Sequence, residues 1–134
     1  MIAMTAEAER LMLAMAEFEG WHPPNKSITP GGSRSYRNHN PGNLRSSPFE
    51  SGRRGGFSFF RNDFVGWMAF HWDLMQKARG NTVTGLNRKS TIEQLIKVWA
   101  PASDGNDPRR YIDFVEKRSG LKRTTTLGEI FLGR

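Results

Sequence analysis

The segment Ser35–Arg45 constrains the fold of this chain more than any other stretch. It reads Ser-Tyr-Arg-Asn-His-Asn-Pro-Gly-Asn-Leu-Arg, and we call it the asparagine loop. Pro41 lacks a backbone N–H and pushes Asn40 toward extended geometry, while Gly42 permits backbone angles that a side chain would forbid. The pattern therefore predicts neither a regular helix nor a strand, but a shaped loop. Loops so rich in side-chain donors and acceptors usually bind a polar ligand such as a sugar, a phosphate or a nucleotide.

Helical patterns lie on both sides of this loop. Apolar residues recur at helical spacing over about residues 5–19, with Thr5 as the cap and Gly20 as the stop. After the loop, Phe57–Phe60 is typical of a short strand, paired in a small hairpin with residues near 44–49. The remaining predicted helices run from Asn62 or Asp63 to about Ala78, from a capping box at Ser90–Glu93 to Trp99, from Asp107-Pro108 to about Arg118, and from Thr126 to Glu129 onward.

The helix that starts at Asn62 or Asp63 carries apolar residues almost all round its axis, which predicts a buried central helix. A chain of 134 residues is long enough for one domain with its own core. We therefore expect a mainly α fold of the α+β class, as a single domain over residues 1–134. It would consist of a helical lobe around the buried central helix, with a small β-hairpin element.

Residue usage limits the classes of site that the chain can hold. There is no cysteine, so disulfides and thiolate metal sites are excluded, and the three histidines are scattered without metal-ligand spacing. We expect no metal and no cofactor. No run approaches the roughly 20 apolar residues of a membrane span. The acidic N-terminus also lacks the basic start and apolar core of a secretory signal, so we expect neither a membrane span nor a signal peptide.

The charge of the chain predicts a polyanionic partner. The formal net charge is +7 and the sequence pI is about 10.4, which suits nucleic acid, an anionic cell wall or an anionic membrane. The alternative is a solvated basic surface kept for solubility. Between residues 34 and 61 the single acid Glu50 stands against six arginines: Arg34, Arg37, Arg45, Arg53, Arg54 and Arg61.

One carboxylate lies at an unusual helical position. Glu19 follows Met15 by four residues and falls on the apolar stripe, whereas Glu17 falls on the opposite side. Partial desolvation there would raise the pKa of Glu19, as a general acid near neutral pH requires. The alternative is a glutamate that turns out to water or pairs with a nearby arginine. The polar side chains that could surround Glu19 are Tyr36, Arg37, Asn38, Asn40, Asn43 and Arg45.

Other catalytic patterns are missing from the sequence. Nothing in it looks like a Ser-His-Asp triad, a phosphate-binding glycine loop or a catalytic Asp/Glu pair at short spacing. An enzyme with this sequence would work with one carboxyl acid and a pocket of amide and hydroxyl groups. Such a set suits the cleavage of a glycosidic bond, in which an acid protonates the leaving oxygen while Asn and Arg bind sugar hydroxyls.

The run Arg37–Arg45 closely resembles the R-N-x-N-P-G-N-[IL]-R signature of phage and mobile-element peptidoglycan-cleaving domains. These domains belong to the lysozyme-like superfamily, close to lytic transglycosylases and goose-type lysozymes. Phe18-Glu19-Gly20 precedes the signature by about twenty residues, where that superfamily has its catalytic glutamate. Downstream, the segment 98–115 is similar to the family's W-A-P…N-D…Y-I…V pattern. The resemblance spans roughly residues 15–120.

The resemblance implies an enzyme that cleaves the β-1,4 bond between N-acetylmuramic acid and N-acetylglucosamine, with Glu19 as general acid and base. The Asn40–Asn43 turn would line the saccharide groove, and Asn43 would contact the sugar or the glutamate. Tyr111 would match a tyrosine near the catalytic carboxyl of lytic transglycosylases, or it is simply a core residue. Trp21 and Tyr36 are the candidates for stacking on sugar rings.

The resemblance favours lytic transglycosylase over hydrolytic muramidase chemistry. In the former, one glutamate acts as acid and then as base, the acetamido group of the substrate assists, and a 1,6-anhydro sugar forms. A muramidase would need a second carboxylate to activate water. Asp104 and Asp107 are the nearest candidates, although their simplest use is loop formation and helix capping.

The expected partner is the peptidoglycan glycan strand, and we expect no nucleic-acid partner. The protein would act as a monomer or as part of a phage or conjugation assembly. Delivery would occur in a phage particle, through a holin, or by a secretion apparatus. The alternative function is a catalytically inactive, basic binding module or virion structural protein that binds cell wall or nucleic acid. The arginines favour it, but helices rich in Lys and Arg are absent and the aromatic residues interleave poorly with the basic ones.

Overall fold

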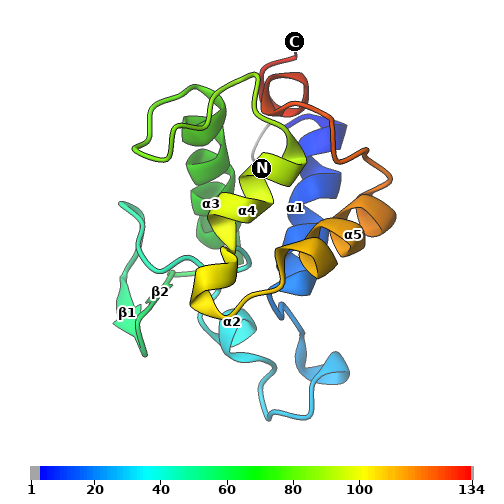
Figure 1. Ribbon diagram of the computed structural model, residues 1–134. Helices are drawn as coiled ribbons and strands as arrows, with labels where there is room; N and C mark the ends of the chain where they lie inside the picture. The colour runs from blue at the N-terminus through cyan, green and yellow to red at the C-terminus, as the bar shows by residue number, and fades with distance from the viewer. Residues whose placement is uncertain (1–3, 134) are drawn as a thin grey trace. The chain divides into compact units, whose positions relative to one another are not determined.

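Helices α1 (Ala6–Phe18) and α3 (Asp63–Ala78) are the longest elements of the computed structural model, which describes residues 4–133 (Figure 1). The described residues group into two units, the first containing residues 15–73 and the second residues 4–14 and 74–133. Helices make up 50% of the described residues and strands 6%. The expected mainly α fold with a small hairpin is therefore confirmed, while the single domain over residues 1–134 stays a prediction.

Helix α1 begins and ends as its sequence predicts. The Thr5 hydroxyl oxygen accepts a hydrogen bond from the N–H of Ala8 at 3.0 Å, which satisfies one of the free donors of the first turn. Glu7 and Glu9 lie in the same turn, where the helix dipole favours negative charge. At the other end, Gly20 has a φ of +90°, a conformation that glycine adopts without strain.

The asparagine loop begins with a helical turn that its composition did not predict. Helix α2 (Arg34–Arg37) forms because the hydroxyl of Ser33 accepts a hydrogen bond from the N–H of Tyr36 at 3.4 Å. A short 3-10 turn, η1 (Pro24–Lys26), precedes it. The prediction of irregular structure is therefore wrong for the first residues of the loop, since a cap just before the loop starts a turn of helix there.

The hairpin pairs β1 (Gly52–Arg54) with β2 (Phe57–Phe59) in antiparallel register. Gly55 and Gly56 connect the strands with φ values of +57° and +83°, the conformation of a tight two-residue turn. The predicted partner near residues 44–49 is therefore wrong, because such a turn pairs β2 with the residues directly before it. Leu44 nevertheless contacts β2, since its carbonyl accepts from the N–H of Ser58 at 2.9 Å.

Helix α3 is buried on one side only. Asn62 caps it by accepting from the N–H of Val65 at 2.9 Å, as predicted. Phe70 is fully buried, but Phe64 is 50% exposed and Trp72 is 39% exposed. The predicted buried central helix is therefore wrong in part, since Phe64 and Trp72 stay partly open to solvent, Trp72 with Phe49 against its ring.

A glycine brings α3 against the asparagine loop within the first unit. A Cβ at Gly66 would lie 1.9 Å from the carbonyl oxygen of His39 and 3.0 Å from Cδ of Pro41. A Cβ at Gly42 would in turn lie 2.7 Å from the ring of Phe70. Loop backbone and helix therefore meet with no room for a side chain at either glycine.

In the second unit, α4 (Ile92–Trp99) packs on α5 (Pro108–Ser119), and the short elements are η2 (Ala102–Asp104) and η3 (Gly128–Leu132). Asp107 caps α5 as predicted, accepting from the N–H of Arg110 at 3.2 Å. The capping box of α4 uses Thr91 and Gln94, one residue later than predicted. Both Ser90 and Thr91 can cap a helix, and only the packed structure selects between them.

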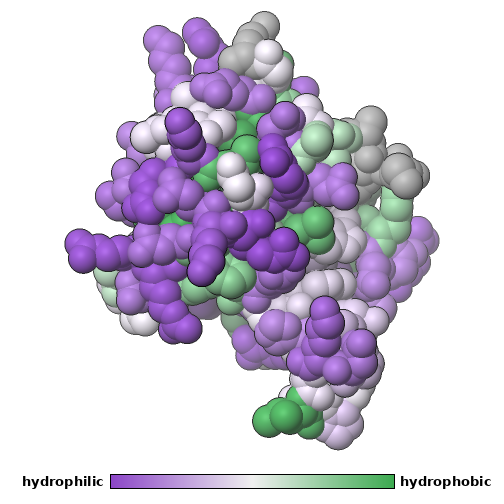
Figure 2. All heavy atoms as spheres, turned by 90° about the vertical axis from the view of Figure 1, so that its right-hand side faces the viewer, coloured by the Kyte–Doolittle hydropathy of each residue, from purple (hydrophilic) through white to green (hydrophobic). Residues whose placement is uncertain are grey.

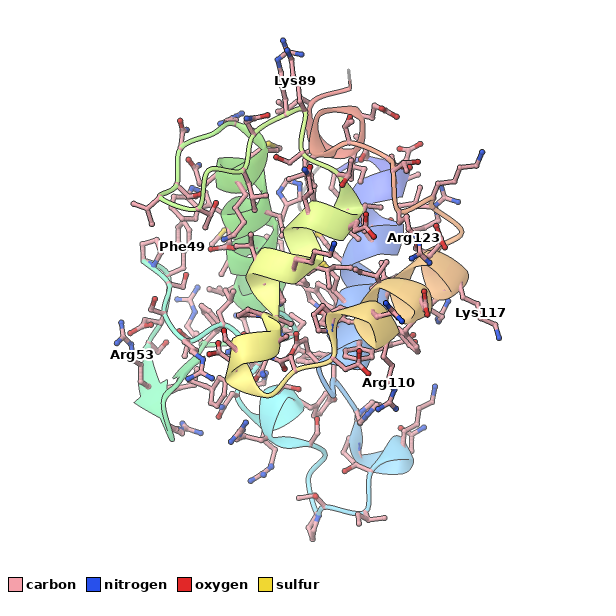
Figure 3. The ribbon with its side chains drawn as sticks, in the orientation of Figure 1. Phe49, Arg53, Lys89, Arg110, Lys117 and Arg123 are labelled. Carbon is pink, nitrogen blue, oxygen red and sulfur yellow. The ribbon has the colours of Figure 1, made fainter. Side chains whose placement is uncertain are left out.

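The C-terminal segment is bound to the start of α4. The N–H of Ile92 donates to the carbonyl of Thr125 at 3.0 Å, and the N–H of Leu127 donates to that of Ser90 at 2.8 Å. Arg123 (Figure 3) adds a link to α5, because its guanidinium donates to Glu116 at 2.8 Å and to Asp113 at 2.7 Å. Apolar residues of α4, α5 and η3 are buried in this unit: Ile92, Leu95, Ile96, Ile112, Val115, Ile130 and Phe131.

The surface of the molecule is largely polar on the face drawn in Figure 2, where hydrophilic side chains predominate and apolar colour is limited to separate patches. None of the helices in residues 4–133 combines the length and the apolar character needed to cross a membrane.

Substitution of Gly66 by alanine tests the close approach of α3 and the loop. In the interior of a helix, replacing glycine by alanine normally stabilises the protein by up to about 1 kcal/mol. Here the new Cβ would meet the His39 carbonyl, so we expect the free energy of unfolding to fall by about 1–3 kcal/mol. Urea denaturation of the two proteins measures the difference. A more stable Gly66→Ala variant would contradict the contact.

Candidate functional site

Glu19 lines a pocket of the first unit just beyond the end of α1. Its backbone N–H donates to the carbonyl of Met15 at 2.9 Å, so it continues the helical turn, and its side chain is half-buried. The pocket has a volume of about 330 Å³. Its lining residues are Glu19, Gly20, His22, Ser33, Arg34, Ser35 and Asn43.

Asn43 meets Glu19 in this pocket. The amide nitrogen of Asn43 donates to Oε1 of Glu19 at 3.5 Å, a long hydrogen bond. Asn43 has a φ of +51°, a left-handed conformation that asparagine tolerates better than most residues. Its N–H donates to the carbonyl of Asn40 at 3.0 Å, which closes the turn. The two residues that the sequence predicts as acid and amide partner are thus neighbours.

His22, Ser33 and Ser35 also line the pocket, and the sequence analysis named none of the three as a site residue. His22 and Ser33 are joined twice, by the Ser33 N–H to the His22 carbonyl at 2.9 Å and by the His22 N–H to the Ser33 hydroxyl at 3.0 Å. The hydroxyls of Ser33 and Ser35 lie 3.4 Å apart. The sequence signal for Ser35 was its place at the start of the asparagine loop, whereas Ser33 and His22 carried none, because the helical turn that Ser33 caps was not predicted.

Asn40 has a structural place in the loop. Its side chain is 1% exposed, and its amide nitrogen donates to the carbonyls of Leu44 and Ser58, each at 2.9 Å. Its amide oxygen accepts from the N–H of Leu44 at 2.9 Å. Both donors of the amide are therefore used inside the protein, and Asn40 does not line the pocket to which the sequence assigned it.

Asn38 is also buried, with 4% exposure, and its backbone carbonyl accepts from the N–H of Phe60 at 2.9 Å. Arg37 holds the loop from outside, since its Nε donates to the carbonyl of Gly32 at 3.2 Å. Neither side chain is among those that line the pocket. The structure thus places these two predicted substrate contacts in the framework of the loop.

Tyr36 and Trp21 belong to an aromatic cluster of the first unit. Their ring centroids lie 5.0 Å apart, and Trp21 also meets Trp67 edge-on at 5.8 Å. Both side chains keep intermediate exposure, so each retains an open part. Arg45 is exposed, with its guanidinium 5.1 Å from the centroid of the Phe57 ring.

Three further candidates lie in the second unit. Tyr111 is on α5 with 1% exposure, as a core residue would be. Asp107 caps α5, and Asp104 lies in the turn η2, where its N–H donates to the carbonyl of Pro101 at 3.1 Å. The loop and capping roles expected for the two aspartates are therefore confirmed.

Glu50 anchors the hairpin through several hydrogen bonds. Its Oε1 accepts from the Ser58 hydroxyl at 2.7 Å and from the Ser47 N–H at 3.0 Å, and its Oε2 pairs with Nε of Arg53 at 3.0 Å (Figure 3). These groups, with the Ser58 hydroxyl first, hold the pKa of Glu50 below its usual value. Glu50 is therefore an ionised structural carboxylate.

His39 has a similar structural partner. Its Nδ1 lies 2.6 Å from Oδ1 of Asp63, and its φ is +52°. The pair joins the middle of the asparagine loop to the first turn of α3. His39, at the variable position of the signature, thus helps to hold the loop in place.

Within residues 4–133, the acidic and histidine side chains form no group of three or more that could hold a metal ion. No family model, curated protein or solved structure matches this chain. The interpretation of the pocket therefore depends on its geometry and on the residues of the signature.

Replacement of Asn40 by alanine would leave two buried backbone groups without a partner, the N–H of Leu44 and the carbonyl of Ser58, while the Leu44 carbonyl would keep the N–H of Ser58. Each unpartnered group costs about 1–3 kcal/mol, so we expect the free energy of unfolding to fall by about 2 kcal/mol or more. Asn25→Ala makes the same chemical change at an exposed position of the first unit and should alter it by less than about 0.5 kcal/mol. Denaturant titration measures the free energy of unfolding of both variants, and an equal decrease in the two would contradict the role of the Asn40 amide.

Proposed function

We propose that this protein is a peptidoglycan-degrading glycosidase that cleaves the β-1,4 bond between N-acetylmuramic acid and N-acetylglucosamine. Glu19 is its catalytic acid. The observation that carries the proposal is the contact of the Glu19 carboxyl with the Asn43 amide in a polar pocket. The Arg37–Arg45 signature and the position of Glu19 before it support the same activity.

Glu19 would protonate the glycosidic oxygen as the bond to the leaving sugar breaks. The amide N–H of Asn43 points at Oε1, so it orients the carboxyl toward the pocket. Such hydrogen bonds are often long in the absence of substrate and shorten when the substrate is bound. The hydroxyls of Ser33 and Ser35 supply donors and acceptors for sugar hydroxyls along the same wall.

Lytic transglycosylase chemistry suits this pocket better than hydrolysis. Glycosidases that use water or a covalent intermediate have two facing carboxylates. Among the described residues that line the pocket, Glu19 is the one carboxylate. Glu19 would therefore act first as acid and then as base, with the acetamido group of the substrate as the internal nucleophile and a 1,6-anhydro sugar as product.

A nucleic-acid-binding module is the competing function, and the hairpin argues against it. Single-stranded nucleic acid stacks its bases on open aromatic rings beside basic groups. Guanidinium groups instead lie over the rings of Phe57 and Phe59, at 4.2 Å for Arg34 and 4.0 Å for Arg54. These ring faces are occupied, so the arginines offer charge without a stacking platform.

The proposed substrate implies a route to the cell wall. We propose that the protein acts as part of a phage particle, or is delivered through a holin or a secretion apparatus. The net charge of +7 would favour its attraction to an anionic wall.

Glu19→Gln keeps the shape of the side chain and removes its titratable proton. We expect the rate of clearing of purified peptidoglycan to fall about 10²–10⁴-fold, the usual contribution of a general acid. Glu17→Gln removes a carboxylate of the same helix and should leave the rate nearly unchanged. Full activity of Glu19→Gln would refute the assignment, and a large loss in Glu17→Gln would transfer it to the other carboxylate.

The products released in the same assay distinguish the two reactions. Hydrolysis adds one water to each new end, whereas transglycosylation adds none and leaves an anhydro end. Mass spectrometry of the released muropeptides should therefore give anhydro masses from the parent protein. Reducing ends alone would exclude the transglycosylase mechanism.

Asn43→Gly removes the amide and keeps a residue that adopts positive φ without strain. The loss of one hydrogen bond to Glu19 should lower kcat by about tenfold, the equivalent of about 1.4 kcal/mol. Thermal unfolding of the variant reports whether the loop remains intact. An unchanged kcat in a folded variant would show that the amide does not orient the carboxyl.

A further inference from the structure

Two arginines of the first unit gather at one aromatic ring. The guanidinium carbon of Arg34 lies 4.2 Å from the centroid of Phe57, and that of Arg45 lies 5.1 Å from it. Arg34 starts α2, Arg45 ends the asparagine loop, and Phe57 starts β2. The ring attracts each cation through its negative face, so it holds two positive charges within 5.1 Å of its centroid.

No carboxylate neutralises this pair among the described residues. Three acids of the same unit have other partners: Glu50 pairs with Arg53, Asp63 with His39, and the Glu19 carboxyl contacts the Asn43 amide. Arg34 and Arg45 are both exposed and form no ion pair in residues 4–133. Two like charges held together repel each other, and a bound anion would relieve that repulsion.

The pair adjoins the proposed catalytic pocket. Arg34 itself lines the pocket with Glu19, and Arg45 follows Asn43 by two residues. An anion held by the two guanidinium groups would therefore lie beside the sugar that Glu19 acts on. Arginine suits such a ligand, because its planar group binds a carboxylate with two parallel hydrogen bonds.

We propose that Arg34 and Arg45, held on Phe57, bind a carboxylate of the muramoyl side of the substrate. This inference rests on the proposed glycosidase function. N-acetylmuramic acid differs from N-acetylglucosamine by a lactyl ether. Its carboxylate is free in peptide-free strands, and in intact peptidoglycan it carries a peptide stem with carboxylates of its own. The site would thus select acidic muramoyl glycans over neutral chitin, which has no group to pair with these cations.

The test measures binding in the inactive Glu19→Gln protein, so that no substrate is consumed. Co-sedimentation compares intact sacculi, peptide-free glycan strands and chitin. In Arg34→Gln/Arg45→Gln, we expect affinity for at least one of the two muramoyl polymers to fall tenfold or more, since hydrogen bonds to charged groups contribute about 1.5–3 kcal/mol each. Affinity for chitin should stay within twofold.

Arg54→Gln is the matched control. Arg54 lies 4.0 Å above the Phe59 ring, is exposed, and does not line the pocket. The variant therefore loses one equally stacked charge of the same hairpin, and its binding should stay within twofold for all three polymers. Phe57→Leu keeps both arginines but removes the ring on which they lie. Its affinity for the same polymer should therefore fall less than that of the double variant.

The substrate that responds identifies the source of the carboxylate. A loss on sacculi alone supports the peptide stem, and a loss on peptide-free strands alone supports the lactyl group. A loss on both supports a site that accepts either. An equal loss on chitin, or an equal loss in Arg54→Gln, would overturn the inference. These ratios come from binding alone, whereas the glycosidase proposal fails separately if the parent protein releases no muropeptides.

Discussion

The side-chain amide of Asn40 is the interaction on which the candidate site depends. It donates to the carbonyls of Leu44 and Ser58 and accepts from the N–H of Leu44, so it closes the loop on itself and joins it to β2. These backbone groups are buried, and without the amide the Leu44 N–H and the Ser58 carbonyl would have no partner, while the Leu44 carbonyl would keep only the N–H of Ser58. The turn that gives Asn43 its left-handed backbone therefore exists because Asn40 is held inside it. The contact with Glu19 follows from that turn.

On the opposite side, two glycines without side chains allow the asparagine loop to pack closely against α3. Gly66 lets the backbone of α3 approach the carbonyl of His39, and Gly42 lies against the ring of Phe70. The loop is thus enclosed between β2, bound by hydrogen bonds, and α3, bound by close packing. A segment without regular secondary structure obtains a defined shape in this way, and a defined shape is what a loop needs to orient a carboxylate.

Local signals account for what the sequence could predict. Thr5, Asn62 and Asp107 cap their helices because capping needs only residues three positions apart. The hairpin partner was predicted wrongly, although the two consecutive glycines Gly55 and Gly56 indicate a tight turn that pairs the residues on either side of it. The roles of the loop asparagines could not be predicted from the sequence, because an amide that binds the backbone and an amide that binds a ligand carry the same donors. Burial distinguishes Asn40 from Asn43, and burial depends on residues distant in the chain. For the same reason, the meeting of Arg34, Arg45 and Phe57 has no sequence signal.

The arginine pair on Phe57 also has a consequence for binding entropy. A free arginine on a surface samples many rotamers, and a ligand that fixes it must overcome a cost of about 0.5–1.5 kcal/mol for each side chain. The ring of Phe57 restricts both guanidinium groups before any ligand arrives. Part of the entropy cost of ordering these side chains therefore arises when the protein folds and not when a ligand binds. A loop that is rigid inside through Asn40 thus carries, on its outer side, cations that are already oriented.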